Sequence, residues 1–114
     1  MTSKDTRVTK VLKRLEVDPA HSISSLAHFV GLSTSRLGHL FKEETGTNLA
    51  QYLDTNRMAR AADLLQTTNL RIKEITFLVG YQHHASFDRA FSRTYRCTPK
   101  RFRLENQKLP KFPV

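Results

Sequence analysis

The stretch IKEITFLVGYQHHASFDRAFSRTYRCTPKRFR, residues 72–103, decides the fold because it repeats an earlier segment of the same chain, residues 23–53. The offset between the copies is 49 up to the glycines and 50 after them, so the second copy has one extra residue in the turn. Each copy predicts a short helix, a tight turn and a second helix, which is the pattern of a helix-turn-helix unit. The matched pairs are Ile23 and Ile72, Leu26 and Ile75, Gly31 and Gly80, Leu37 and Phe87, Phe41 and Phe91, and Tyr52 and Phe102.

Apolar periodicity of the helical type runs along the chain and predicts an all-α fold of about seven helices. No segment has a convincing alternation of apolar and polar residues, and there is no Asn-Gly or Asp-Gly hairpin signal. Proline, glycine and capping residues set the expected ends of the helices. The expected ranges are 4–17, 23–30, 34–45, 49–66, 72–79, 83–95 and a last helix that begins at Thr98-Pro99.

The expected organisation is one domain over residues 1–106 that contains two helix-turn-helix subdomains. The first subdomain covers about 4–46 and the second about 72–106, and the long central helix at 49–66 joins them. Two such units on one chain can contact two successive segments of a DNA groove without dimerisation. Residues 107–114 are expected to form a flexible tail.

The charge of the chain predicts a polyanionic partner. Nineteen Lys and Arg against ten Asp and Glu give a formal net charge of +9, and the isoelectric point is near 10.2. Residues 1–70 carry nine bases and seven acids, whereas residues 71–114 carry ten bases and three acids. Nucleic acid fits this excess best, and an anionic membrane surface is the less common partner. A surplus of charge that serves only solubility is the alternative interpretation.

Several classes of protein are not expected from this sequence. Cys97 is the only cysteine, so neither an internal disulfide nor a cysteine pair for zinc is predicted. The adjacent His83 and His84 leave a helix in different directions, and no acidic residue or sulfur lies at ligand spacing. No apolar run reaches transmembrane length, and the first ten residues lack a signal-peptide core. We therefore expect a cytoplasmic protein that is not an enzyme, with no metal site and no cofactor.

Residues 8–103 resemble the DNA-binding domain of the AraC/XylS family of bacterial transcription regulators. The resemblance is carried by SISSLAHFVGLSTSRLGHLFKEETG at 22–46 and by residues 72–103, with Phe-x-Arg-x-Phe at 87–91 and Thr-Pro at 98–99. Arg96 stands where the family commonly has glycine. If that position is left-handed here, Arg96 carries strain of about 1 kcal/mol, and the alternative is that the helix closes with a different turn. The other departures from the family pattern are Thr76 for alanine, Tyr81 for phenylalanine, Ser92 for lysine and Phe102 for tyrosine.

The resemblance implies that helices 34–45 and 83–95 are recognition helices that enter adjacent major-groove segments of double-stranded DNA, about 10 bp apart. Gly38 has no side chain, so it either lets its helix approach the DNA closely or contributes nothing. The implied base contacts are Ser35, Gly38, His39, Lys42, His84, Ala85, Ser86, Asp88 and Arg89.

Arg89 is the candidate base contact with the clearest chemistry. Its guanidinium can donate two hydrogen bonds to guanine, which contribute about 1–3 kcal/mol of discrimination. A structural salt bridge with Asp88 or Glu74 is the alternative role. His39 and His84 can donate or accept at a base edge. Asp88 can accept from cytosine, or it can orient a neighbouring arginine.

Basic residues beside the second recognition helix predict phosphate contacts, which fix the position of a protein on DNA without selecting a sequence. The candidates are Arg93, Lys100 and Arg101, and Lys42 can act in the same way. The first backbone N–H groups of the helices at 23, 72 and 99 can add to them. A charged helix face that meets only solvent is the alternative interpretation.

A protein-interaction module is the second functional hypothesis. Its partner would be RNA polymerase or another regulator, and its DNA binding would be non-specific. RNA binding is less favoured, because the aromatic residues are assigned to the core and leave no stacking platform. Many members of the family carry an effector-binding domain before this one, so the chain is either a stand-alone monomeric regulator or an excised domain.

Overall fold

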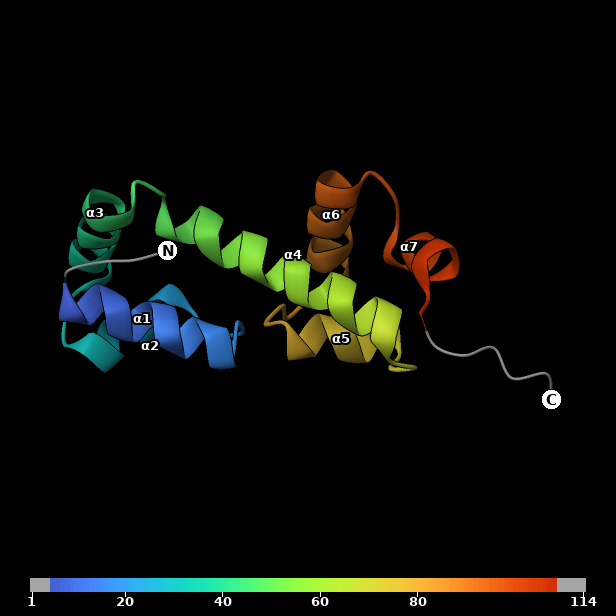
Figure 1. Cartoon of the computed structure of the whole chain (residues 1–114), viewed down its shortest axis with the longest axis horizontal. Helices are drawn as coiled ribbons and strands as arrows, with labels where there is room; N and C mark the ends of the chain where they lie inside the picture. The colour runs from blue at the N-terminus through green and yellow to red at the C-terminus, as the bar shows by residue number, and fades with distance from the viewer. Residues whose placement is uncertain (1–4, 109–114) are drawn as a thin grey trace. The chain divides into compact units, whose positions relative to one another are not determined.

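A computed structural model describes residues 5–108 of the 114-residue chain. Within these residues the chain forms seven α-helices and no strand, which confirms the all-α prediction (Figure 1). The helices are α1 (Thr6–Val17), α2 (Ile23–Val30), α3 (Thr34–Thr45), α4 (Leu49–Thr67), α5 (Ile72–Leu78), α6 (His84–Tyr95) and α7 (Pro99–Asn106).

The helix ends agree with the predicted ends to within one or two residues where the structure describes them. The last of the expected helices begins as predicted, because the Thr98 side chain accepts from Arg101 N–H and Pro99 follows it. Helix α6 begins one residue later than expected, since His83 has extended dihedral angles and serves as its N-cap. The predicted start at residue 4 and the tail residues 109–114 lie outside the described part. At the described end, the backbone N–H of Lys108 donates to the carbonyl of Gln66 at 2.9 Å.

The chain divides into two compact units in the middle of α4. The N-terminal unit ends at Asn56 and the C-terminal unit begins at Arg57. The sequence predicts that the helix at 49–66 is a linker between two subdomains, whereas in the structure each half of α4 belongs to the core of one unit. The repeat is therefore longer than the sequence indicated, because α1 corresponds to the second half of α4. Buried residues match at an offset of 50 in the pairs Val8 and Met58, Val11 and Ala61, Leu12 and Ala62, and Leu15 and Leu65.

The core of the N-terminal unit joins α1, α2, α3 and the first half of α4. The apolar stripe of α1 is buried as its spacing predicts, and Leu37 and Phe41 of α3 are fully buried. The Phe41 ring lies 5.3 Å from the ring of Tyr52, which fixes α3 against α4. The buried residues are Val8, Val11, Leu12, Leu15, Leu26, Ala27, Leu37, Phe41, Leu49 and Leu53.

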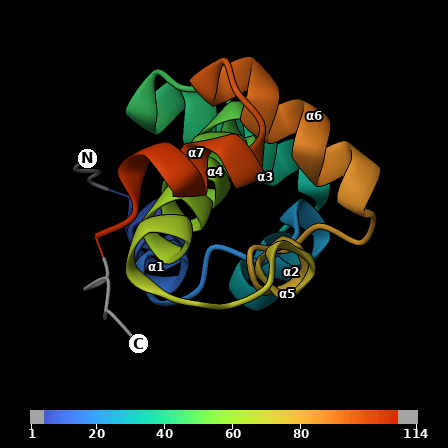
Figure 2. The same cartoon turned by 90° about the vertical axis from the view of Figure 1, so that its right-hand side faces the viewer.

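The core of the C-terminal unit is richer in aromatic residues. Phe91 of α6 lies 5.8 Å from Phe87, 4.6 Å from Tyr95 and 5.3 Å from Phe102 of α7, measured between ring centroids. Figure 2 shows α7 beside the end of α4. At that junction the Arg103 guanidinium donates to the carbonyls of Leu65 and Thr68 at 3.1 and 3.2 Å. Arg103 thus satisfies carbonyls at the end of α4 that have no partner within the helix.

Helices α3 and α6 both end at a residue in the left-handed region, and only one of these residues is glycine. Gly46 has φ 77° and its N–H donates to Lys42, whereas Arg96 has φ 62° and its N–H donates to Ser92. The two positions differ by 50, so they are the same place in the repeat. The sequence left two possibilities for Arg96, a strained left-handed residue or a different turn at the end of the helix, and the φ angle of 62° shows the first of them. Arg96 ends α6 in this conformation, and Thr98 begins α7 two residues later.

Replacing Arg96 by glycine should stabilise the protein. The substitution removes left-handed strain, and the extra freedom of glycine in the unfolded chain offsets part of the gain. We expect Arg96→Gly to raise the free energy of unfolding by about 0.5 kcal/mol, measured by urea denaturation. The matched change Gly46→Ala should lower it by about 0.5 kcal/mol, because it creates the same strain in the other unit and the lost freedom of glycine in the unfolded chain offsets part of the cost. An Arg96→Gly protein less stable than wild type would contradict this account.

Removing the Phe87 ring should destabilise the protein strongly. Phe87 has no exposed surface and contacts the rings of Tyr81 and Phe91, each at 5.8 Å. We expect Phe87→Ala to cost about 3–5 kcal/mol in the free energy of unfolding, because it leaves a cavity. Arg89→Ala on the exposed side of the same helix is the control and should change stability by less than about 0.5 kcal/mol. Equal stability of the two variants would show that the buried face is misplaced.

Candidate nucleic-acid interface

The outer face of α3 carries the first set of candidate base contacts. The Ser33 side chain caps the helix by accepting from Arg36 N–H at 3.1 Å, and the buried Leu37 and Phe41 turn the opposite face outward. On that face Ser35, His39 and Lys42 are exposed and Gly38 is half-buried. The structure therefore brings the four predicted residues of this helix together on one surface.

These four residues line a hollow of about 420 Å³. A Cβ atom built on Gly38 would meet nothing within 4 Å, so packing inside the protein does not require glycine there. Glycine nevertheless weakens a helix interior by about 1 kcal/mol relative to alanine. The hollow is completed by residues from α2, α3 and the start of α4, namely Ile23, Thr34, Asn48, Leu49 and Ala50.

The outer face of α6 carries the second set. Phe87, Ala90 and Phe91 are buried on its inner side. On the other side His84, Ala85 and Arg89 are exposed, while Ser86 and Asp88 are half-buried. The structure thus leaves all five predicted residues of α6 with accessible surface, spread over about two turns of one helix.

The Arg89 guanidinium forms no ion pair or hydrogen bond with the described part of the chain. The alternative role of Arg89 as a salt-bridge partner of Asp88 or Glu74 is therefore absent from residues 5–108. The Glu74 carboxylate instead accepts from the backbone N–H of Arg71 at 3.3 Å and caps α5. An arginine fork that is both exposed and uncommitted can bind a guanine edge or a phosphate.

His84 contacts Thr76, which is not among the site residues predicted from the sequence. Its Nδ1 lies 3.4 Å from the hydroxyl oxygen of Thr76 on α5. Thr76 has no exposed surface and is the one polar residue buried to this degree within residues 5–108. The signal in the sequence was a threonine on the inner face of a helix, at a position where the family resemblance expects alanine.

The candidate phosphate contacts differ in whether their side chains have a partner within the described chain. Arg93 and Lys100 are exposed and have no side-chain partner in the described chain. Arg101 is also exposed, but its Nε donates to the Glu105 carboxylate at 2.8 Å. This hydrogen bond raises the pKa of the Arg101 guanidinium, and a phosphate must compete with Glu105 for it.

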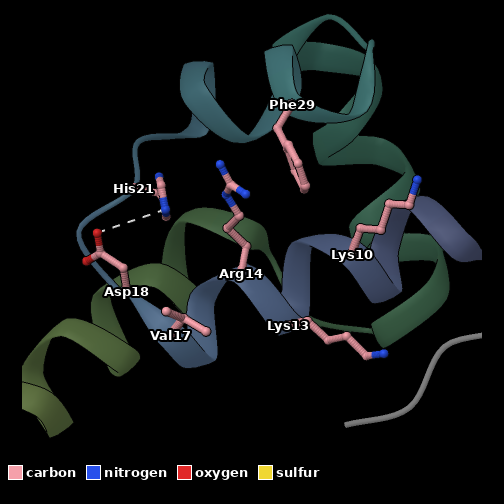
Figure 3. A pocket seen from close by; sticks show the side chains of 7 residues that line it. All are labelled: Lys10, Lys13, Arg14, Val17, Asp18, His21 and Phe29. Atoms are coloured by element: carbon pink, nitrogen blue, oxygen red, sulfur yellow. Dashed lines mark ion pairs between the residues drawn. The ribbon is translucent and has the colours of Figure 1, made fainter.

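A larger hollow of about 550 Å³ lies away from the α3 face, between α1 and α2 (Figure 3). Its walls share no residue with the hollow on α3. The Arg14 guanidinium lies 4.0 Å from the centre of the Phe29 ring, a favourable cation–π contact. The lining residues are Lys10, Lys13, Arg14, Val17, Asp18, His21 and Phe29.

Metal binding and membrane insertion are two alternative functions for such a chain. Within residues 5–108 no three side chains of histidine, cysteine, aspartate or glutamate gather as they would around a metal ion. None of the described helices has the length and apolar character needed to cross a bilayer.

Comparisons with known proteins identify the family. Residues 26–105 match the sequence model of a family described as a helix-turn-helix domain. The probable transcription factor PqrA of Proteus vulgaris is 32% identical over 107 residues, which cover 90% of this chain and 87% of PqrA. The HTH-type transcriptional activator RhaR of Mannheimia succiniciproducens is 36% identical over 72 residues, which cover 63% of this chain. These residues make up only 26% of RhaR, so the chain spans about a quarter of that relative.

Two solved structures have the same fold. The C-terminal domain of AraT, a response regulator from Geobacillus stearothermophilus, superposes with a TM-score of 0.83 at 26% identity, over 96% of this chain and 93% of that domain. The DNA-binding domain of AdpA, solved in complex with a target DNA, superposes with a TM-score of 0.77 over 89% of this chain and 93% of the AdpA chain, and its 21% identity shows likeness of fold alone. On the family match and the similarity to PqrA, the chain belongs to the AraC family of helix-turn-helix DNA-binding domains.

Proposed function

We propose that this chain is a sequence-specific regulator of transcription that binds double-stranded DNA through α3 and α6. The observation that carries the proposal is the exposed face of α6, where the Arg89 fork has no partner among residues 5–108 and stands opposite a buried aromatic stripe. Helix α3 has the same division into a buried and an exposed face. In the proposed complex the two helices enter neighbouring major-groove segments about one helical turn apart.

The charge of the C-terminal unit supports the proposal. From Arg57 onward the chain has twelve Lys and Arg against four Asp and Glu, which is +8 of the total +9. We assign Arg93, Lys100 and Arg101 to phosphate contacts, with Arg101 the weakest because Glu105 holds it. The uneven charge predicts that the C-terminal unit supplies most of the non-specific, salt-dependent affinity for DNA.

The relatives support the same class of function, since PqrA and RhaR are named as a probable transcription factor and a transcriptional activator. We propose that the chain binds as a monomer, because one chain already contains two recognition helices. Such a regulator acts in the cytoplasm, where bacterial DNA is found.

A second candidate function is a contact with another protein, such as RNA polymerase. The observation that favours it is a pair of exposed apolar side chains on α5, Phe77 and Leu78, each 53% exposed. Adjacent apolar side chains on a surface favour a protein partner. This contact is compatible with DNA binding by α3 and α6.

Selection of binding sites from random duplex DNA at near-physiological salt tests the proposed function. We expect two enriched segments about one helical turn apart. A single enriched segment would restrict base recognition to one unit. Equal, salt-sensitive binding to every sequence would overturn the proposal and favour the protein-interaction alternative.

Replacing Arg89 by alanine should relax the preference at one base pair of the selected site. A lost pair of hydrogen bonds to guanine lowers discrimination there by about 1–3 kcal/mol, while the other positions keep their preferences. Repeating the selection with the variant measures this change. Arg93→Ala is the matched control, since loss of a phosphate contact weakens all sequences alike and lowers the salt slope by about one. A uniform loss of affinity in Arg89→Ala would move Arg89 to the phosphate contacts.

Replacing Gly38 by alanine should raise the stability of the protein and weaken its binding to DNA. The change should stabilise α3 by about 1 kcal/mol, because a helical glycine is removed and the Cβ has open space. In the complex the same Cβ occupies the space through which the helix approaches the bases, so we expect weaker binding to the selected site. Urea denaturation and a binding titration measure the two effects. Higher stability with unchanged affinity would show that Gly38 has no part in DNA binding.

A further inference from the structure

The buried Thr76 hydroxyl is placed between the core of the C-terminal unit and the proposed DNA surface. The hydroxyl group donates a hydrogen bond to the carbonyl oxygen of Ile72, one turn earlier on α5, at an O···O distance of 2.9 Å. The hydroxyl oxygen also lies 3.4 Å from Nδ1 of His84 at the start of α6. Burial excludes water from the hydroxyl, so these two groups are its partners within the described chain.

The hydrogen bond to Ile72 determines which group is the donor in the contact between Thr76 and His84. A threonine hydroxyl has one hydrogen and two lone pairs. The shorter contact uses the hydrogen, so the oxygen can only accept from His84. His84 must then carry a hydrogen on Nδ1. A neutral imidazole carries one hydrogen, which leaves the other ring nitrogen, Nε2, as an acceptor on an exposed side chain.

We propose that Thr76 is a positioning residue that holds His84 in the Nδ1–H tautomer, so that Nε2 selects a base with an amino group in the major groove. This inference rests on the proposed function of α6 as a recognition helix. Adenine and cytosine present amino hydrogens there, whereas guanine and thymine present oxygen acceptors at the corresponding places. An acceptor on His84 therefore favours adenine or cytosine at one position of the site and disfavours guanine and thymine.

The N-terminal unit provides an internal comparison. At the matching positions it has Ala27, which is buried, and Thr34, which is the first residue of α3. Neither side chain can form the Thr76–His84 contact. We therefore expect this kind of preference in the DNA segment bound by α6, and not through the corresponding residue of α3.

Nitrogen-15 NMR of the histidine side chains tests the tautomer in the free protein, without any DNA. At a pH that keeps imidazoles neutral, we expect His84 to carry its hydrogen on Nδ1 in the wild type and in Thr76→Ser, which keeps the hydroxyl. In Thr76→Val, which removes it, the Nε2–H form should increase. A wild-type His84 protonated on Nε2 would overturn the proposal, as would a Thr76→Val spectrum with the wild-type tautomer.

Selection from random duplex DNA tests the consequence for base choice. Wild type and Thr76→Ser should enrich adenine or cytosine at the position contacted by His84. Thr76→Val should lose roughly fivefold of that preference, as expected for a single hydrogen bond. His84→Ala changes only an exposed side chain and identifies the position by losing the preference there. An unchanged preference in both Thr76→Val and His84→Ala would overturn the proposal.

The two measurements distinguish a failure of the proposed function from a failure of the positioning role of Thr76. If selection enriches no sequence with any variant, the proposed function of the whole chain fails, while the NMR result still reports the tautomer. If selection gives a defined site, and the base preference at the position contacted by His84 is the same in Thr76→Val as in wild type, the proposed function stands and the positioning role of Thr76 is overturned.

Discussion

The orientation of each recognition helix depends on one buried aromatic contact that occurs once in each unit. In the N-terminal unit Phe41 lies 5.3 Å from Tyr52, and in the C-terminal unit Phe91 lies 5.3 Å from Phe102. Both phenylalanines have no exposed surface. Burial of a large ring favours folding by several kcal/mol, roughly 2–3 for the side chain alone. Because a helix has only one inner face, fixing that ring fixes which residues face outward, and the polar face of α3 or α6 follows from it.

The two units keep their inner residues similar and differ at the outer ones. At an offset of 50, the outer positions Ser35, Gly38, His39 and Lys42 correspond to Ala85, Asp88, Arg89 and Ser92. Close packing constrains shape on the inner side, whereas the outer side is constrained only by what it binds. Two recognition helices with different outer residues are suited to two different sequences, so a site for this protein need not be a palindrome. The charge differs in the same way, with +8 in the C-terminal unit and +1 in the other.

The C-terminal unit departs from the repeat at two places that have local physical explanations. Arg96 takes the left-handed conformation of its counterpart Gly46, which shows that the turn geometry outweighs the steric preference of the residue. Thr76 replaces the buried Ala27, and its hydroxyl satisfies the carbonyl of Ile72. A buried hydroxyl is costly unless it is hydrogen-bonded, so this second departure is stable only with its partner in place. It also links the core of the unit to His84 on the proposed DNA surface.

The helices, the repeat and the two outer faces follow from the amino-acid sequence, because periodicity, caps and glycines are local features of the chain. Apolar residues recur at helical spacing in α1, α3 and α6, and the structure buries those that face inward, namely Val8, Val11, Leu12, Leu15, Leu37, Phe41, Phe87 and Phe91. Helical spacing also indicates that Ala61 and Leu65 of the long helix face inward, and both are buried. Only packing between distant helices decides that the two halves of this helix belong to two different cores. Packing also decides which charged side chains have partners within the described part of the chain: Arg89 has none there, Arg101 donates to Glu105, and Arg103 donates to the carbonyls of Leu65 and Thr68. Those outcomes depend on distances between residues far apart in the chain or across a helical turn, and composition and spacing do not contain them.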